Sequence, residues 1–228
     1  MAVRPRQAAS LIALWTDGTG SRHLLMGKRG ESLRFLPGYL VFPGGRLERQ
    51  DWVKPNETDG SSMGLDAKHR SALDREWVKH RLASMTRLSP ADALLNAALR
   101  ECLEETGIDL SRSIDGRARY VGRAVTPPGG PIRFDTRFFL VRILSEGAPP
   151  AAQQLVDGEL LSTGWRSLEE IACGKVHHIT RGMLDHAIAV NEGADDLPLL
   201  IADRTPKHWS GKPALRSRNL RAPNPDQT

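Results

Sequence analysis

Four carboxylates lie close together in the segment AALRECLEETGIDL, residues 97–110. On a helix, Glu101, Glu104 and Glu105 are spaced i, i+3 and i+4, so they share one face, and Asp109 follows. Like charges at this spacing weaken a helix by roughly a few tenths of a kcal/mol per pair, and the C-terminal end of a helix also disfavours anions. A bound divalent cation would compensate, and oxygen-only ligands favour Mg²⁺ or Mn²⁺ over zinc.

A simpler interpretation of the same cluster stays open. A solvated acidic face, or glutamates paired with arginines from elsewhere in the chain, would also account for it. Beside the acids, Leu95, Ala98, Leu99 and Cys102 follow the i, i+3, i+4, i+7 spacing of an apolar stripe. We therefore expect one helix that buries this stripe and carries the acids on a second face.

Other residues could bind phosphate groups or fill the core. Arg29 and Arg34 flank a glycine-rich stretch, and a guanidinium matches the geometry of phosphate; plain surface charge is the alternative for both. Phe134, Phe138 and Phe139 alternate with other residues in RFDTRFFLV, and we expect them to pack in a strand core rather than to stack on a base.

The segment RECLEETGI, residues 100–108, resembles the second half of the Nudix box, G-x5-E-x7-R-E-U-x-E-E-x-G-U, where U is apolar. Seven specified positions match in register, with Cys102 as the soft match at an apolar position. FPGGRLE, residues 42–48, resembles the start of the same box, with Gly45 as its glycine. The chain is therefore similar to Nudix hydrolases over roughly residues 8–190.

An insertion separates the two halves of this box. Asp51 lies six residues after Gly45 and Asp92 lies eight before Arg100, and either could stand for the first glutamate of the box. The insertion is about 41 residues long, the distance from Asp51 to Asp92 (92 − 51 = 41). Such an interrupted box resembles that of the peroxisomal-type coenzyme A diphosphatases and their bacterial relatives.

Two further stretches are similar to that branch, and one departs from it. RFLPGYLVFPGG, residues 34–45, fits R-x3-G-x3-F-P-G-G, and RFDTRFFLV at 133–141 is also similar. The motif L-L-T-x-R-[SA] appears here only as LMGKRG. Arg29 aligns with its arginine, but Gly27 replaces the threonine and Gly30 the small residue, which leaves the substrate open.

The resemblance implies an α/β Nudix fold, in which helices sandwich a mixed β-sheet, with a helical insertion inside the box. It also implies metal-dependent hydrolysis of a diphosphate that joins a nucleoside to another group, with Mg²⁺ or Mn²⁺. Metal ions would neutralise charge on the diphosphate and lower the pKa of the attacking water.

The resemblance also assigns roles to individual residues. The implied metal ligands are Glu101, Glu104, Glu105 and the backbone carbonyl of Gly45 or Gly44. Arg100 would orient the glutamates, and Arg29 and Arg34 would bind the phosphates. The base would be Glu101 or an additional acid found in this region of family members, which is Glu159 here, with Asp157 as its rival.

Three functions remain to be distinguished. The first is cleavage of coenzyme A or acyl-CoA to 3′,5′-ADP and (acyl-)phosphopantetheine. The second keeps the mechanism but acts on ADP-ribose, a dinucleotide or a nucleoside triphosphate, a choice to which the insertion at 52–91 would contribute. The third is a nucleic-acid-binding module that uses a basic tail; the complete glutamate set argues against it. Family habit allows a homodimer, although no sequence feature requires one.

The predicted elements place the acids on a helix within a mixed sheet. Ser89, followed by Pro90, is typical of a helix start, and Gly107 of a helix end. Strands are predicted at 9–15, 22–28, 39–42, 118–125, 133–144 and 161–166, and helices at 65–86, 91–106, 167–173 and 180–190.

Composition limits the remaining possibilities. The 228 residues carry a net charge of +5, of which the tail at 205–228 contributes five Lys or Arg against one Asp. We therefore divide the chain into a Nudix domain, 1–204, and a basic tail, 205–228. No apolar run reaches the roughly 20 residues of a membrane span, and two cysteines are no disulfide framework, so we expect a cytoplasmic protein. The small-molecule diphosphate substrate is what the Nudix resemblance implies.

Overall fold

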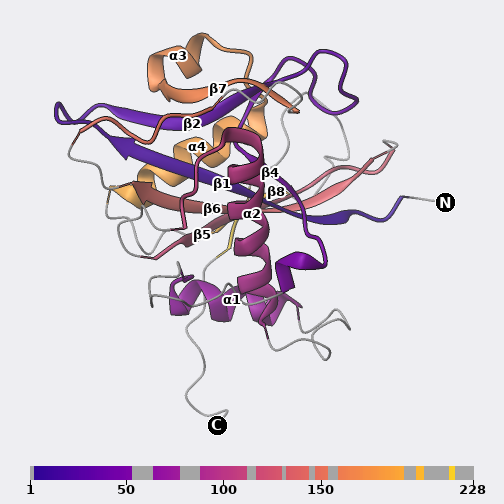
Figure 1. The fold of residues 1–228 in the computed structure, drawn as a ribbon. Helices are drawn as coiled ribbons and strands as arrows, with labels where there is room; N and C mark the ends of the chain where they lie inside the picture. The colour runs from indigo at the N-terminus through magenta and orange to yellow at the C-terminus, as the bar shows by residue number, and fades with distance from the viewer. Residues whose placement is uncertain are drawn as a thin grey trace.

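A mixed β-sheet lies at the centre of the molecule, with helices on both faces (Figure 1). The structure is a computed structural model and describes residues 3–52, 64–77, 88–111, 117–129, 132–143, 147–153, 159–192, 199–202 and 216–218. Its strands are β1 (Arg6–Thr16), β2 (Arg22–Arg29), β3 (Leu40–Val41), β4 (Gly44–Arg46), β5 (Arg119–Val125), β6 (Phe134–Ile143), β7 (Leu160–Ser167), β8 (Leu199–Ala202) and β9 (Arg216–Arg218). Its helices are η1 (Gln50–Trp52), α1 (Ala67–Trp77), α2 (Pro90–Thr106), α3 (Leu168–Cys173) and α4 (His178–Asn191).

The strands follow the order β3-β2-β1-β6-β5-β8-β9 in the described part of the chain, with β4 paired to β1 and β7 to β2. β1 and β6 run parallel from Arg6↔Phe134 to Trp15↔Ile143, whereas β1 and β2 are antiparallel. Central strands covered on both faces read as continuous apolar runs, and β1 is buried from Ala8 to Leu14.

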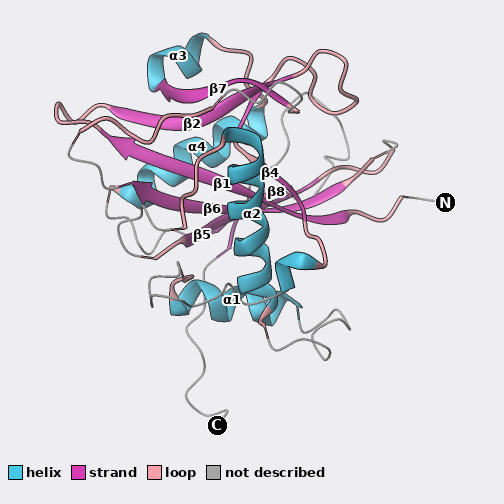
Figure 2. Ribbon diagram, viewed as in Figure 1, coloured by secondary structure: helices cyan, strands magenta, loops and turns pink. Residues whose placement is uncertain are grey.

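Two hydrophobic cores lie on opposite faces of the sheet (Figure 2). On β6, Phe139 points into the core that α2 covers, and the adjacent Phe138 points into the core that α4 covers. This alternation follows from the two-residue period of a strand. The predicted Nudix architecture, a mixed sheet between helices, is confirmed.

The helix α2 begins and ends where its capping residues predict. The Ser89 side chain accepts a hydrogen bond from the Asp92 backbone N–H at 3.2 Å, and Pro90 occupies the first turn. Gly107 has φ 69°, the left-handed conformation that glycine adopts readily, and its N–H donates to the Leu103 carbonyl. Leu95, Ala98 and Cys102 are fully buried, so the apolar stripe is confirmed.

The described part of the insertion packs at the start of α2. The Asp74 carboxylate of α1 accepts a hydrogen bond from the Ala91 N–H at 3.1 Å, and Arg70 pairs with Asp92 at 2.9 Å. Figure 1 shows α1 at the end of α2 that is remote from Thr106. The described helix of the insertion therefore supports the fold at the end of α2 opposite the acids.

Most predicted elements are present, with three differences. Helix α1 covers 67–77 of the expected 65–86, and residues 78–87 lie outside the described chain. The short elements β4, η1, β8 and β9 were not predicted, and β9 lies within the segment assigned to the tail. The expectation for Phe134 was wrong, because it is only half-buried and contacts Phe35 edge-on, with ring centroids 5.4 Å apart.

Among the helices in the described ranges, none is both long and apolar enough to cross a membrane.

Candidate active site

The C-terminal half of α2 lies against two glycines of β4. The Gly44 N–H donates a hydrogen bond to Glu105 Oε2 at 2.9 Å. A Cβ atom at Gly44 would lie 2.5 Å from the Ala9 carbonyl oxygen, and one at Gly45 would overlap the Glu101 carboxylate. The two glycines are therefore required for the close approach of strand and acids, which is the reason that a glycine pair precedes an acidic helix in this chain.

Arg100 holds the centre of the cluster with all five of its N–H donors. Its Nε and Nη2 bind the two oxygens of Asp51, at 2.8 and 3.2 Å. Its Nη1 donates to Glu101 Oε1 at 3.0 Å and to Glu104 Oε2 at 2.8 Å. Its remaining bond goes from Nη2 to the Arg46 carbonyl at 3.0 Å.

This saturation shows what Arg100 does in the cluster. A guanidinium with five donors engaged orients Glu101 and Glu104 and has no donor left for a further ligand. These carboxylates raise the pKa of Arg100 above its ordinary value, with the hydrogen bond to Asp51 as the largest cause. The arrangement agrees with the orienting role that the Nudix resemblance implies.

The structure also separates the two candidates for the first acidic position of the box. Asp51 is 3% exposed and forms the two-pronged ion pair with Arg100. Asp92 lies at the other end of α2, where it accepts a hydrogen bond from the Ser89 hydroxyl and pairs with Arg70. Asp51 therefore belongs to the cluster, and Asp92 belongs to the helix start.

Glu105 and Glu101 are acids in unfavourable surroundings. Burial raises the pKa of Glu105 to about 8, and the hydrogen bond from Gly44 opposes this only in part. Burial also raises the pKa of Glu101, against the lowering effect of Arg100. Carboxylates held in such surroundings are typical of sites where a cation or a proton is bound in function.

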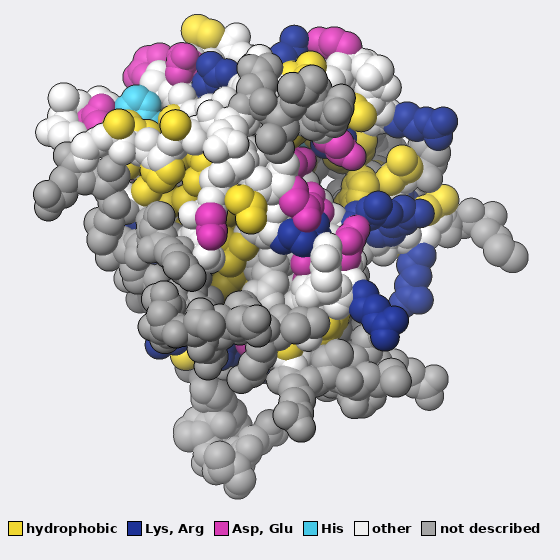
Figure 3. All heavy atoms as spheres, viewed as in Figure 1, with side chains coloured by type: hydrophobic (Ala, Val, Ile, Leu, Met, Phe, Trp, Pro, Cys, Tyr) yellow, Lys and Arg dark blue, Asp and Glu magenta, His cyan; other side chains and the backbone are white. Residues whose placement is uncertain are grey.

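Glu104 differs from both, because its side chain is 53% exposed while it stays bonded to Arg100. The three glutamates thus span the range from buried to solvent-facing along one helix face. Figure 3 shows acidic and basic side chains side by side on this face of the molecule.

A second group of charged residues lies beside this cluster. Arg29, whose side chain is 14% exposed, donates from Nε to the Phe35 carbonyl at 2.8 Å and pairs through Nη2 with Glu159 at 3.2 Å. Both Arg29 and Glu159 act electrostatically on the pKa of Glu105, Glu159 raising it and Arg29 lowering it. The structure thus brings Arg29 and Glu159 together near the acids of α2.

Arg34 is exposed, and no hydrogen bond or ion pair joins its side chain to the residues that the structure describes. Asp157, the rival of Glu159, lies outside the described residues. Of the candidate phosphate-binding residues, Arg29 is held in place and Arg34 projects from the surface.

The donor atoms around α2 fit a hard divalent cation in type. They are carboxylate oxygens, and Glu105 is buried with the Gly44 N–H as its hydrogen-bond donor. Within the described ranges, however, no three acidic, histidine or cysteine side chains converge on one point. Glu101 and Glu104 share Arg100 Nη1, so a cation bound by both would compete with that guanidinium for their oxygens.

Sequence reasoning left one residue near the site undecided and missed another. Asp51 and Asp92 lie at the two ends of the 41-residue insertion. The sequence shows this spacing, but it does not show which of the two lies near the glutamates in the fold. Phe35 gave no signal, because its contact with Arg29 uses the backbone carbonyl, which any residue carries, and its ring contact is with Phe134, far away in the chain.

Comparison with known proteins gives a consistent result. A family model described as NUDIX domain matches residues 70–187, just over half of the chain. A NUDIX hydrolase from Alicyclobacillus acidocaldarius is similar in structure, with a TM-score of 0.55 and 23% identity over 82% of this chain and 92% of that one.

Two further solved structures are similar at lower scores. The NUDIX domain of Shewanella oneidensis NrtR, complexed with ADP ribose, has a TM-score of 0.49 and 11% identity over 82% of this chain and 88% of that one. A C. elegans Ap4A hydrolase has a TM-score of 0.46 and 15% identity over 82% of this chain and 99% of that one.

Proposed function

This chain belongs to the Nudix hydrolase family, whose members act on pyrophosphate bonds, and we propose that it is a metal-dependent diphosphatase whose substrate is coenzyme A or acyl-CoA. The products would be 3′,5′-ADP and (acyl-)phosphopantetheine. The observation that carries the proposal is the Arg100 cluster, which holds the acids of the box against a glycine strand.

We assign cation binding to the acids of α2. Nudix hydrolases generally use divalent metal ions, and Glu101, Glu104 and Glu105 would hold Mg²⁺ or Mn²⁺ together with the carbonyl of Gly45. When bound, the ion would neutralise charge on the diphosphate and lower the pKa of the attacking water. Arg100 and Asp51 keep the helix face in register with β4, so that the ligands are fixed before substrate arrives.

We assign the proton and phosphate contacts to the second charged group. Glu159 is 64% exposed, so it can accept a proton from a water molecule in the open site. Arg29 holds that carboxylate at 3.2 Å and is anchored by its bond to Phe35. Arg29 and Arg34 supply the guanidinium groups that would bind the phosphates, and Glu101 is the alternative base.

One observation favours a different substrate for the same chemistry. Gly27 stands where the coenzyme A motif has threonine, and a Cβ atom there would lie 2.8 Å from Leu160 Cβ and 2.9 Å from Thr163 Cγ2. A β-branched side chain does not fit this position. ADP-ribose, a dinucleotide or a nucleoside triphosphate is therefore the second candidate substrate class.

A substrate panel tests both candidates. Coenzyme A, acetyl-CoA, ADP-ribose, NADH and a nucleoside triphosphate would be incubated with Mg²⁺ or Mn²⁺, and the products identified by mass spectrometry, with Glu104→Gln as the inactive control. Preferential release of 3′,5′-ADP from coenzyme A supports the first candidate. Turnover of ADP-ribose or another nucleotide in its place supports the second, and no cleavage of any diphosphate would reject the proposed chemistry.

A further inference from the structure

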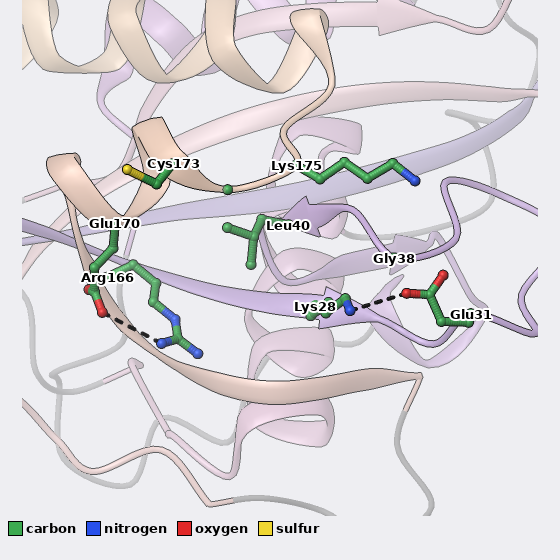
Figure 4. A pocket seen from close by; sticks show the side chains of 9 residues that line it. Lys28, Glu31, Gly38, Leu40, Arg166, Glu170, Cys173 and Lys175 are labelled. Atoms are coloured by element: carbon green, nitrogen blue, oxygen red, sulfur yellow. Dashed lines mark ion pairs between the residues drawn. The ribbon is translucent and has the colours of Figure 1, made fainter.

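A cavity of about 580 Å³ lies beside β2 (Figure 4), and none of the acids of α2 lines it. It is lined from three parts of the chain: the segment from β2 through the following loop to β3, the end of β7, and α3 with the residues that follow it. Leu40 lines this cavity and packs against the core on the α4 face, whereas α2 covers the opposite face. The cavity is thus separated by the sheet from the candidate active site.

Lys175 is a cation held in a fixed position on the cavity wall. Its Nζ donates to the Pro37 carbonyl at 3.3 Å and lies 4.4 Å from the centre of the Tyr39 ring. In the described part of the chain, no carboxylate lies within ion-pair distance of it. The charge of Lys175 is therefore oriented by the fold without an internal anion to neutralise it.

Two further cations in the cavity have weakly held partners. Lys28 pairs with Glu31 at 3.1 Å, and the side chains are 49% and 70% exposed. Arg166 lies 3.8 Å from Glu170 Oε1, beyond hydrogen-bond distance, while its Nη2 donates to the Ser162 carbonyl at 2.8 Å. Exposed pairs of this kind contribute roughly 0–1 kcal/mol, so a ligand that binds Lys28 and Arg166 loses little by displacing the carboxylates.

Glu170 does not depend on Arg166 for its position. Its other oxygen, Oε2, accepts the Ser167 backbone N–H at 2.8 Å as part of the capping box of α3. That bond holds the carboxylate at the start of the helix, and the distance of 3.8 Å to the Arg166 guanidinium is too long for a hydrogen bond. The cavity therefore presents three cations around the apolar Leu40. Lys175 is oriented by the fold, and Lys28 and Arg166 have carboxylate partners that bind them only weakly.

We propose that this cavity is a second binding site, which takes a small ligand bearing a phosphate monoester. A phosphate monoester carries close to two negative charges and three acceptor oxygens, which matches three cations that come from separate elements, one of them a guanidinium. The phosphate could belong to a third phosphate group of the substrate itself or to a separate metabolite. The binding site uses none of the residues assigned to hydrolysis; only the case in which the substrate supplies the phosphate rests on the proposed function.

The reactivity of Cys173 can be used to measure the electrostatic character of this cavity. It is exposed and lines the wall, whereas the other cysteine, Cys102, is buried with its pKa raised to about 12 by burial, so Cys102 does not react under the same conditions. The rate of alkylation of Cys173 by anionic iodoacetate would be divided by the rate with neutral iodoacetamide. The same ratio for free cysteine gives the reference, and the Cys173→Ser variant verifies the labelled residue.

The ratio should exceed the reference and should respond to single charges. Lys175→Met is expected to lower it about twofold to threefold, and Glu31→Gln to raise it by a similar factor, at low ionic strength. Lys68→Met, an equal change of charge on the distant helix α1, is the matched control and should leave the ratio unchanged. Equal ratios in all four proteins would contradict an anion-attracting cavity.

Ligand protection then decides the chemical class. AMP and inorganic phosphate should slow iodoacetamide labelling in a saturable way, adenosine should not, and Lys175→Met should remove the protection. If coenzyme A protects and Lys175→Met raises its KM but not that of dephospho-coenzyme A, the substrate supplies the phosphate. Unchanged KM values together with protection by AMP indicate a separate ligand, and absence of protection by any phosphate overturns the proposal.

Discussion

The two arginines nearest the acids, Arg100 and Arg29, are held in opposite ways. Arg100 donates five hydrogen bonds to neighbouring groups, two of them to the buried Asp51. Arg29 makes one bond to a carbonyl and one ion pair to Glu159, which is 64% exposed. The first arrangement fixes the geometry of the site, and the second can exchange a partner when a ligand arrives.

This difference leads us to assign the reaction itself to the region around Arg100 and the choice of substrate to the region around Arg29. The region around Arg100 matches the Nudix pattern closely, and its residues bind one another. The region around Arg29 departs from the coenzyme A motif at Gly27 and carries exposed side chains. We therefore expect substitutions in the first region to affect every substrate alike and those in the second to alter the choice among substrates.

The largest expected effect concerns Glu104. Glu104→Gln should lower kcat by about a thousandfold for every substrate, because an amide cannot replace a carboxylate toward a divalent ion. Thermal unfolding should change little, since the side chain is 53% exposed. Glu192→Gln, at another exposed glutamate, is the control; full turnover by Glu104→Gln would place the metal site elsewhere.

The variants Arg100→Met and Arg29→Met test whether the two arginines contribute differently to the stability of the fold. Loss of Arg100 leaves Asp51 buried and unpaired, so the free energy of unfolding should fall by about 3 to 5 kcal/mol. Loss of Arg29 removes a partly exposed pair and should cost below about 1 kcal/mol. Urea denaturation measures both, and similar losses would show that the two regions are not held differently.

The pH dependence of the metal-free protein follows from Glu105. Its pKa is about 8 when folded and near 4.5 when unfolded, so the folded state binds the extra proton between these values. The resulting stability is fully present below pH 4.5 and is lost as the pH rises through 8, by on the order of 5 kcal/mol. Chemical denaturation with a chelator at several pH values should show this decline, and Glu105→Gln should flatten it.

Gly27→Thr sharpens the question of substrate. The new side chain meets Leu160 and Thr163, so unfolding should become easier by roughly 1–3 kcal/mol. Gly30→Ser is the matched control at the other departure from the motif, because a Cβ atom there lies at an ordinary 3.7 Å from Leu33. A stable Gly27→Thr variant with increased coenzyme A turnover would reject the steric argument.

Sequence reasoning found the parts of the site that depend on local spacing. The helix caps Ser89 and Gly107 and the apolar stripe follow from neighbours along one helix, so they could be predicted. The meeting of Asp51 with Arg100 spans 49 positions, and that of Arg29 with Glu159 spans 130. Such contacts depend on how strands are ordered in the sheet, and the residues themselves carry no signal of it.

The burial of Glu105 was unpredictable for the same reason. Helical spacing places Glu104 and Glu105 on neighbouring positions of one face, yet one is exposed and the other is buried under β4. The approach of a strand from 61 positions away makes the difference. Phe134 shows the opposite error, because its strand pattern predicts burial and its position at the end of β6 leaves it half-buried.

The pairing of β9 with β8 changes how the C-terminal segment can be studied. Residues 216–218 form the outermost described strand at that side of the sheet and satisfy the hydrogen-bonding groups of β8. Deleting 205–228 to test for RNA binding would leave β8 as a bare edge, where another chain could add and the protein could aggregate. Replacing Lys207, Lys212 and Arg221 by glutamine would lower the net charge of the segment from +4 to +1 (4 − 3 = 1) and leave the residues of β9 in place to protect that edge.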